Sequence, residues 1–160
     1  MTNEVVYNIA KAYFADGTID WDTNEYIKCL LVDATTTASG SYDPDVTSVS
    51  AAVTGAGASV LTGANADASG TVIAASARSV SADNTNNRAV LYINPSATTW
   101  TSADFGSVGA VLIYWASGAM SQSQGIPISY HDGGFPVTTN GGDLTVNFAG
   151  GSNNEAIYLT

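Results

Sequence analysis

The sequence predicts a mainly β fold, an antiparallel β-sandwich or jelly roll with a short helix near its N-terminus. Two apolar runs, Tyr26 to Val32 and Gly109 to Trp115, have the β-branched, aromatic and aliphatic composition of strands that are buried on both faces. Shorter strand-like segments are separated by turns rich in Gly, Asn and Ser, and strands do not alternate with helices. With 160 residues, the chain has the length of a single domain.

The N-terminal half begins with a predicted helix. Apolar residues from Val5 to Ala15 recur at spacings of three and four, and Gly17 can end the helix in the left-handed conformation. Short polar side chains in Asp20 to Asn24 then predict a turn that leads into the first apolar run. Thr, Ala, Ser and Gly dominate from about residue 33 to 70, so we expect a loop-rich segment there. Within it, Val46 to Val53 forms either one turn of helix or a short strand.

The C-terminal half predicts strands that are joined by tight turns. Thr71 to Ser81 and Arg88 to Ile93 flank the polar turn Asp83 to Asn87, which is the pattern of a β-hairpin. Asp132-Gly133-Gly134 predicts another tight turn. Three more segments have an alternating or continuous apolar pattern and are expected to be strands: Ile126 to His131, Leu144 to Phe148 and Ala156 to Leu159.

The composition is acidic and poor in charged residues. Four Lys and Arg stand against 14 Asp and Glu, and the net charge of −10 should repel nucleic acids and anionic membranes. Only 11% of the residues are charged, so much of the surface must be small and neutral, and such side chains lose little entropy when they pack against another protein. No signal peptide and no apolar run of membrane-spanning length is evident. We therefore expect a protein made in a cytoplasm that packs against other proteins.

Alternating oxygen-bearing side chains make Asp20, Asp22 and Asn24 weak candidates for a calcium site. An EF-hand loop that starts at Asp20 would need Gly at position 25 and a bidentate Glu at position 31, where this chain has Glu25 and Leu31. A turn is therefore the favoured interpretation, and no metal site is predicted.

Catalytic chemistry has little support in the sequence. The single histidine, His131, is next to Asp132, but no Gly-x-Ser-x-Gly elbow is present, and we expect His131 at the surface or in a turn. Cys29 lies within an apolar run and is expected to pack as a small hydrophobic residue. The Gly-rich segments lack the Lys-Ser/Thr of a phosphate-binding loop, so no cofactor is predicted.

The three tryptophans allow two interpretations. Trp21, Trp100 and Trp115, together with eight tyrosines, could form a flat platform for sugar rings. Their positions within or beside predicted strands favour packing in the core and at subunit contacts instead.

Several segments together carry a resemblance to a known family. They are the N-terminal helix that runs into Asp16 to Asn24, the Tyr26 to Val32 strand, the turns at Tyr42 to Asp45 and Asp83 to Asn87, Thr99-Trp100-Thr101 before Gly109 to Trp115, and Asn140 to Phe148. With these segments the chain resembles the capsid decoration, or cement, proteins of tailed bacteriophages. The resemblance implies a jelly-roll-like β fold, homo-oligomers that are often trimers, a position on the outer surface of the virion capsid, and no enzymatic activity.

The leading hypothesis is therefore a structural virion protein that binds the major capsid protein from outside and stabilises its lattice. We expect partner contacts in the loop-rich segment, from Tyr42, Asp43, Pro44, Asp45, Val46, Val49 and Val53. The alternative is a phage tail-associated or adhesion module that binds host-surface glycans through exposed Trp and Tyr side chains. A weaker third hypothesis, a glycoside-processing enzyme, would require a pocket with two close carboxylates.

Overall fold

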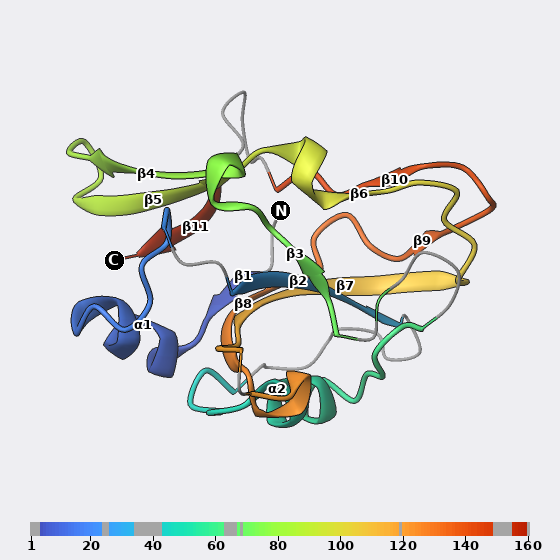
Figure 1. Cartoon of the computed structure of the whole chain (residues 1–160), viewed down its shortest axis with the longest axis horizontal. Coiled ribbons are helices and arrows are strands. Elements are labelled where there is room, and N and C mark those ends of the chain that lie inside the picture. The colour runs from blue at the N-terminus through green and yellow to red at the C-terminus, as the bar shows by residue number, and fades with distance from the viewer. Residues whose placement is uncertain are drawn as a thin grey trace.

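The computed structural model describes residues 4–23, 26–33, 43–62, 67, 69–118, 120–148 and 155–159. Within these ranges the fold is mainly β, as predicted, and every strand pairing is antiparallel. A six-stranded central sheet is covered on one face by a three-stranded and a two-stranded sheet (Figure 1). Helix α2 (Val49–Gly55) covers the other face.

The central sheet is built around the two predicted apolar runs. Its strand order is β1 (Glu4–Val6), β8 (Ile126–His131), β7 (Ser107–Trp115), β2 (Ile27–Asp33) and β3 (Thr71–Val72), while β9 (Val137–Thr138) pairs with the start of β7. The two central strands pair along most of their length, from Ile27 with Trp115 to Val32 with Ala110. The predicted strands at these runs, and the one that ends at His131, are confirmed.

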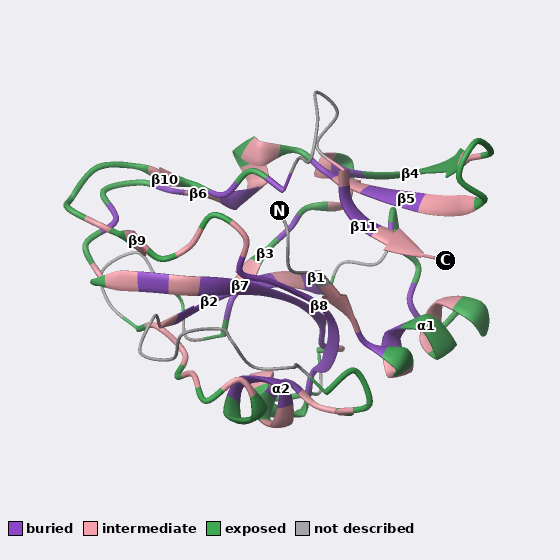
Figure 2. Ribbon diagram, turned by 180° about the vertical axis from the view of Figure 1, so that it is seen from behind, coloured by how far each residue is buried: buried purple, intermediate pink, exposed green. Residues whose placement is uncertain are grey.

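The central sheet supplies two separate cores, because successive side chains of a strand point to opposite faces. Leu31 of β2 and Ile113 of β7 belong to the larger core, on the side of the small sheets. Their neighbours Leu30 and Leu112 belong to the smaller core, under α2. Figure 2 shows this buried middle of the molecule, with the exposed residues gathered in the outer layers.

The two small sheets close the larger core. One has the order β11 (Glu155–Leu159), β5 (Arg88–Ile93) and β4 (Arg78–Asp83), and the other pairs β6 (Thr99–Trp100) with β10 (Leu144–Thr145). The predicted hairpin at Asp83 to Asn87 is confirmed as the β4–β5 connection. Leu91, Ile157 and Trp100 pack from these sheets into the larger core. Three short 3-10 helices lie in the connections: η1 (Ala75–Ala77), η2 (Pro95–Thr98) and η3 (Gln122–Gln124).

Both helices differ in extent from their predictions. Helix α1 (Asn8–Ala15) begins later than Val5, because Val5 and Val6 form β1 and pair with β8. Gly17 follows the helix with a φ of +79°, which confirms the predicted left-handed conformation. The segment from Val46 to Val53, for which a helical turn and a short strand were both predicted, contains most of helix α2. The side chain of its N-cap residue, Ser48, accepts a hydrogen bond from the backbone N–H of Ala51 at 3.2 Å.

Two strand predictions are too long. The segment from Thr71 to Ser81 is split into β3, η1 and the start of β4, and β10 contains only Leu144 and Thr145 of the predicted Leu144 to Phe148 strand. Phe148 is nevertheless buried, so the apolar alternation predicted the inward face correctly. The sheets face each other as in a β-sandwich, while the finer jelly-roll connectivity stays a prediction.

Candidate partner-binding surface

The segment before α2 is attached firmly to the rest of the fold. The Asp43 carboxylate accepts a hydrogen bond from the N–H of Asp45 at 2.9 Å, which forms a tight turn around Pro44. The carbonyl of Pro44 accepts the N–H of Asn8 at 2.9 Å, and the Asn8 amide donates to the Asp45 carboxylate at 2.6 Å. These bonds fix the acidic turn to the first residue of α1.

Helix α2 presents one face to the core and the other to solvent. Val49, Ala52 and Val53 are buried in the smaller core, at helical spacing. The backbone N–H of Val49 donates to the carbonyl of Gly125 at 2.8 Å, which ties the start of the helix to the segment before β8. The exposed side chains of this region are mostly small and polar or acidic, and together we call them the α2 surface: Asp43, Pro44, Asp45, Thr47, Ser50 and Thr54.

The residues predicted to contact a partner differ in how exposed they are. Asp43, Pro44 and Asp45 are exposed and Val46 is half-buried, whereas Tyr42 lies outside the described residues. Val49 and Val53 were wrong choices, because only 0% and 7% of their surface is exposed and their side chains pack against the central sheet. On the same helix, Ser50 and Thr54 are exposed.

The weak metal candidates lie in a turn beside a cation. Asp20 and Asp22 are exposed, and Asn24 lies outside the described residues. Hydrogen bonds from Thr23 and Asp22 lower the pKa of the Asp20 carboxyl, and the charges of both aspartates act on Arg78. The described part of the chain contains no group of three or more His, Cys, Asp and Glu side chains that could hold a metal ion.

All three tryptophans pack inside the molecule. Trp21, Trp100 and Trp115 are 3%, 4% and 9% exposed, so the prediction of core packing is confirmed. The indole N–H of Trp21 donates to the carbonyl of Tyr92 at 3.3 Å. Tyr13 meets the ring of Trp115 edge-on, with 6.4 Å between the ring centroids.

The prediction for His131 is wrong, because this residue is 1% exposed rather than at the surface. β1 pairs along the outer edge of β8 and places Glu4 opposite His131, and the ring of Phe148 packs edge-on at 5.0 Å between centroids. The imidazole Nε2 and the hydroxyl of Ser129 are 2.8 Å apart. The β7–β8 ladder has a register shift beside this pair, because Ser129 lies opposite Ile113 while Pro127 lies opposite Tyr114.

This buried Ser–His pair is the feature that the sequence did not reveal. Burial lowers the pKa of His131 to about 3, so the imidazole is neutral at ordinary pH and pairs with the hydroxyl of Ser129. Ser129 is 0% exposed, so substrate cannot reach its hydroxyl in this fold. Cys29 is likewise buried, as predicted, and burial raises the pKa of its thiol, which keeps it protonated and unreactive.

None of the helices in the described ranges is both long and apolar enough to cross a membrane. The α2 surface presents small polar and acidic side chains to solvent, and hydrogen bonds such as that between Asn8 and Asp45 hold it to the rest of the fold. The chain matches no protein-family model, no curated protein and no solved structure.

Proposed function

We propose that this chain is a structural virion protein of a tailed bacteriophage, a capsid decoration or cement protein that binds the outside of the head and stabilises the major capsid protein lattice. The observation that carries the proposal is the α2 surface, in which small and acidic side chains sit on a helix anchored to the central sheet. The family resemblance of the sequence supplies the identity of the partner. Self-association, as a trimer, belongs to the same proposal.

The physical argument is one of preorganisation. Thr47, Ser50 and Thr54 lose little side-chain entropy on contact, and the helix beneath them is fixed by its buried face and by the Val49 hydrogen bond to Gly125. Many such modest contacts, repeated around a shell, can stabilise a lattice without any single strong interaction. Asp43 and Asp45 add negative charge, which favours a neutral or basic region of the partner.

The glycan-binding alternative loses its main support in this fold. It requires exposed aromatic platforms, whereas all three tryptophans are buried. Tyr26, at 40% exposed, is the one large aromatic side chain with extensive exposure among the described residues.

The test uses capsids assembled without this protein, to which purified protein is added back. Bound protein is measured by co-sedimentation, and shell strength by DNA release on heating or osmotic shock. We expect wild-type protein to bind and to raise the release temperature. Thr54→Arg, which places a long charged side chain on the α2 surface, should weaken binding by about tenfold or more.

A matched control is Thr138→Arg on β9, since Thr138 is also exposed but lies far from α2 in the fold (Figure 1). This variant should bind like the wild type. Failure of the wild-type protein to bind bare capsids, or equal survival of particles with and without it, would refute the proposed function. Equal binding by Thr54→Arg would instead remove the α2 surface as the contact.

A further inference from the structure

Strand β4 forms an open edge of the three-stranded sheet. Its middle residues, Ser79, Val80, Ser81 and Ala82, are all exposed, and Val80 is 50% exposed (Figure 2). In Figure 1 the strand lies at the outer rim of its sheet, and within the described ranges only β5 pairs with it. Natural edge strands are usually blocked by Lys, Pro, a bulge or extreme shortness. The four middle residues of β4 have none of these features.

The direction of the unpaired backbone groups follows from the hairpin. The N–H of Asn94 donates to the carbonyl of Ala77 at 2.8 Å, which makes these residues a hydrogen-bonded pair at the start of the ladder. Such pairs recur at every second residue of an antiparallel ladder, so residues 79, 81 and 83 also turn their N–H and C=O groups toward β5. Arg78, Val80 and Ala82 consequently turn theirs outward, away from the sheet.

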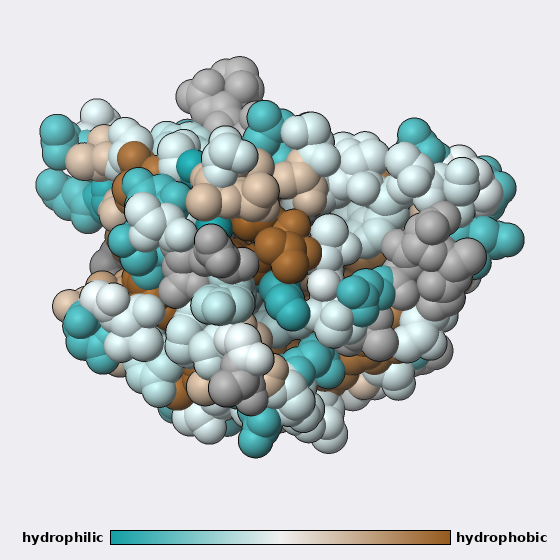
Figure 3. All heavy atoms as spheres, in the orientation of Figure 1, coloured by the Kyte–Doolittle hydropathy of each residue, from teal (hydrophilic) through white to brown (hydrophobic). Residues whose placement is uncertain are grey.

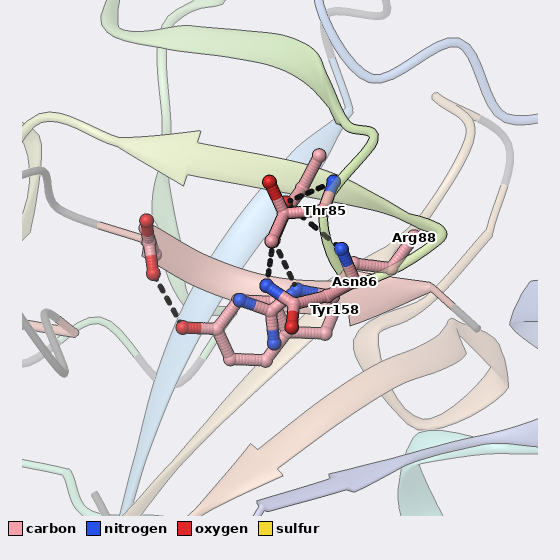
Figure 4. A network of polar contacts seen from close by, with 6 residues as sticks. Thr85, Asn86, Arg88 and Tyr158 are labelled. Atoms are coloured by element: carbon pink, nitrogen blue, oxygen red, sulfur yellow. Dashed lines mark hydrogen bonds and ion pairs between the residues drawn. The ribbon is translucent and has the colours of Figure 1, made fainter.

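Both ends of β4 are held in place, so the edge is preformed. At the turn, the Asp83 carboxylate accepts hydrogen bonds from the Asn86 amide at 2.7 Å and the Arg88 guanidinium at 2.8 Å (Figure 4). The same guanidinium lies 3.7 Å from the centroid of the Tyr158 ring on β11. At the other end, the Arg78 guanidinium donates to the carbonyl of Trp21. A rigid edge loses little conformational entropy when another strand docks on it.

Charge makes this edge suitable for a second copy of the same chain. The chain as a whole has 4 Lys and Arg against 14 Asp and Glu, so two copies repel each other over most of their surfaces. Along the β4 edge, in contrast, the four middle residues are uncharged and the charges at its ends are balanced locally, since Arg88 pairs with Asp83 at 2.8 Å and the charges of Asp20 and Asp22 act on Arg78. Two copies can therefore meet along the uncharged middle of β4 without bringing unpaired like charges together.

We propose that β4 pairs antiparallel with β4 of a second copy, through a two-fold contact centred on Val80. A two-fold axis perpendicular to a sheet requires each residue on the axis to lie opposite itself. Centring on Val80 pairs the outward backbone groups of Arg78, Val80 and Ala82 with those of Ala82, Val80 and Arg78 of the second copy. The two exposed Val80 side chains then pack on each other, and Ser79 lies opposite Ser81, so that no like charges meet.

This contact goes beyond the proposed function, because it concerns pairing between copies and is independent of the capsid. It is also two-fold, and so differs from the three-fold assembly that the family resemblance implies. Only a few residues from each copy take part, which is less than the standard interface of about 1,600 Å². The pair should therefore form reversibly and depend on concentration.

Sedimentation velocity over about 10 µM to 1 mM protein tests the contact. As the protein concentration rises, we expect the sedimenting mass of the wild-type species to double, whether that species is a monomer or an oligomer at low concentration. Val80→Lys would place two ammonium groups opposite each other and should abolish this doubling. Val72→Lys is the matched control, since Val72 is 53% exposed on the short edge strand β3, where Figure 3 shows exposed hydrophobic atoms; it should behave like the wild type.

Disulfide trapping tests the register without relying on a charged variant. Directly opposite residues of a hydrogen-bonded pair have Cα atoms about 5.5 Å apart, within the range of a disulfide. Val80→Cys should therefore form a covalent dimer under mild oxidation, whereas the Cα atoms of the two Ser81→Cys residues would be about 7–8 Å apart on the diagonal, so this variant should not. Circular dichroism checks that each variant is folded.

A wild-type protein that shows no doubling up to the highest concentration would overturn the proposal, as would doubling that persists in folded Val80→Lys. Equal trapping of the Val80→Cys and Ser81→Cys proteins would overturn the register centred on Val80. None of these measurements involves capsids, so failure here leaves the proposed function to its own test.

Discussion

Lowering the pH from 7 to 5 is expected to destabilise the fold through one side chain, His131. Burial lowers the pKa of this imidazole to about 3, against an ordinary value of 6.5 in the unfolded chain. Below pH 6.5 the unfolded state therefore binds a proton that the folded state does not bind. Stability is lost as the pH falls from about 6.5 toward 3 and is unaffected by this group above that window.

The size of the effect follows from proton linkage. A group that titrates only in the unfolded state lowers the free energy of unfolding by about 1.4 kcal/mol per pH unit once the pH is well below 6.5. Between pH 7 and pH 5 the loss amounts to about 2 kcal/mol, and it is the same for any native pKa below about 4. Urea denaturation at pH 7, 6 and 5, followed by tryptophan fluorescence, measures it.

The control is His131→Gln, which can still hydrogen-bond to Ser129 but does not titrate. The readout is the dependence of stability on pH rather than the absolute stability of the variant. His131 is the single histidine of the chain, so the variant should lose less stability than the wild type over this range. Parallel pH profiles for the two proteins, or an imidazole that titrates near pH 6.5 by NMR in the folded state, would refute the reasoning.

Two further predictions concern packing and hydrogen bonding, and thermal or urea unfolding measures both. A Cβ at Gly125 would lie 2.6 Å from the Tyr114 ring, so Gly125→Ala should destabilise the fold by about 1–3 kcal/mol. A Cβ at Gly55 would meet no atom of the described residues within 4 Å, so Gly55→Ala should be neutral or slightly stabilising. Equal effects of the two alanines would contradict this packing. The buried hydroxyl of Tyr7 has no hydrogen-bond partner among the described residues, so Tyr7→Phe should cost less than about 0.5 kcal/mol. Thr98→Val removes the 2.8 Å hydrogen bond from the Thr98 hydroxyl to the Val146 carbonyl and should lower the free energy of unfolding by about 1–3 kcal/mol. A larger loss for Tyr7→Phe than for Thr98→Val would contradict the absence of a partner for the Tyr7 hydroxyl in the described part of the chain.

The fold was most predictable where local pattern and tertiary environment agree. The apolar runs that became β2 and β7 are buried on both faces, so composition alone was enough to predict central strands. The hairpin at Asp83 was equally clear, because its turn is stabilised by the residue types that define it: the Asp83 carboxylate accepts from the backbone of Thr85 and Asn86.

Failures arose where pairing with a distant strand decided the outcome. Val5 and Val6 fit a helical spacing, but they complete the edge of β8 and become β1. His131 precedes a glycine turn and was expected to be exposed, yet β1 and Phe148 cover it from segments far away in the sequence. The pattern of neighbouring residues in the sequence does not show which distant segment will pair with a strand or cover a side chain.

The burial of the residues that were predicted to contact a partner was partly predictable from the sequence. The spacing of Val49, Ala52 and Val53 is that of one helix face, which indicates that both valines are buried. The loop-like composition of the segment obscured this pattern. This helix face points inward because it packs against the apolar face of β2 that contains Leu30. A strand that is buried on both faces has such an apolar face available for an amphipathic helix.

The two cores on either side of the central sheet have a consequence for how the molecule can diversify. Leu30 and Leu31 are adjacent in sequence, yet they serve different cores, so repacking beneath α2 need not disturb the packing beneath the small sheets. The layer that carries the α2 surface can thus change while the central sheet and the small sheets stay the same. Substitutions beneath the outer helix can therefore change that layer while the hairpin sheet, with its open β4 edge, keeps its geometry.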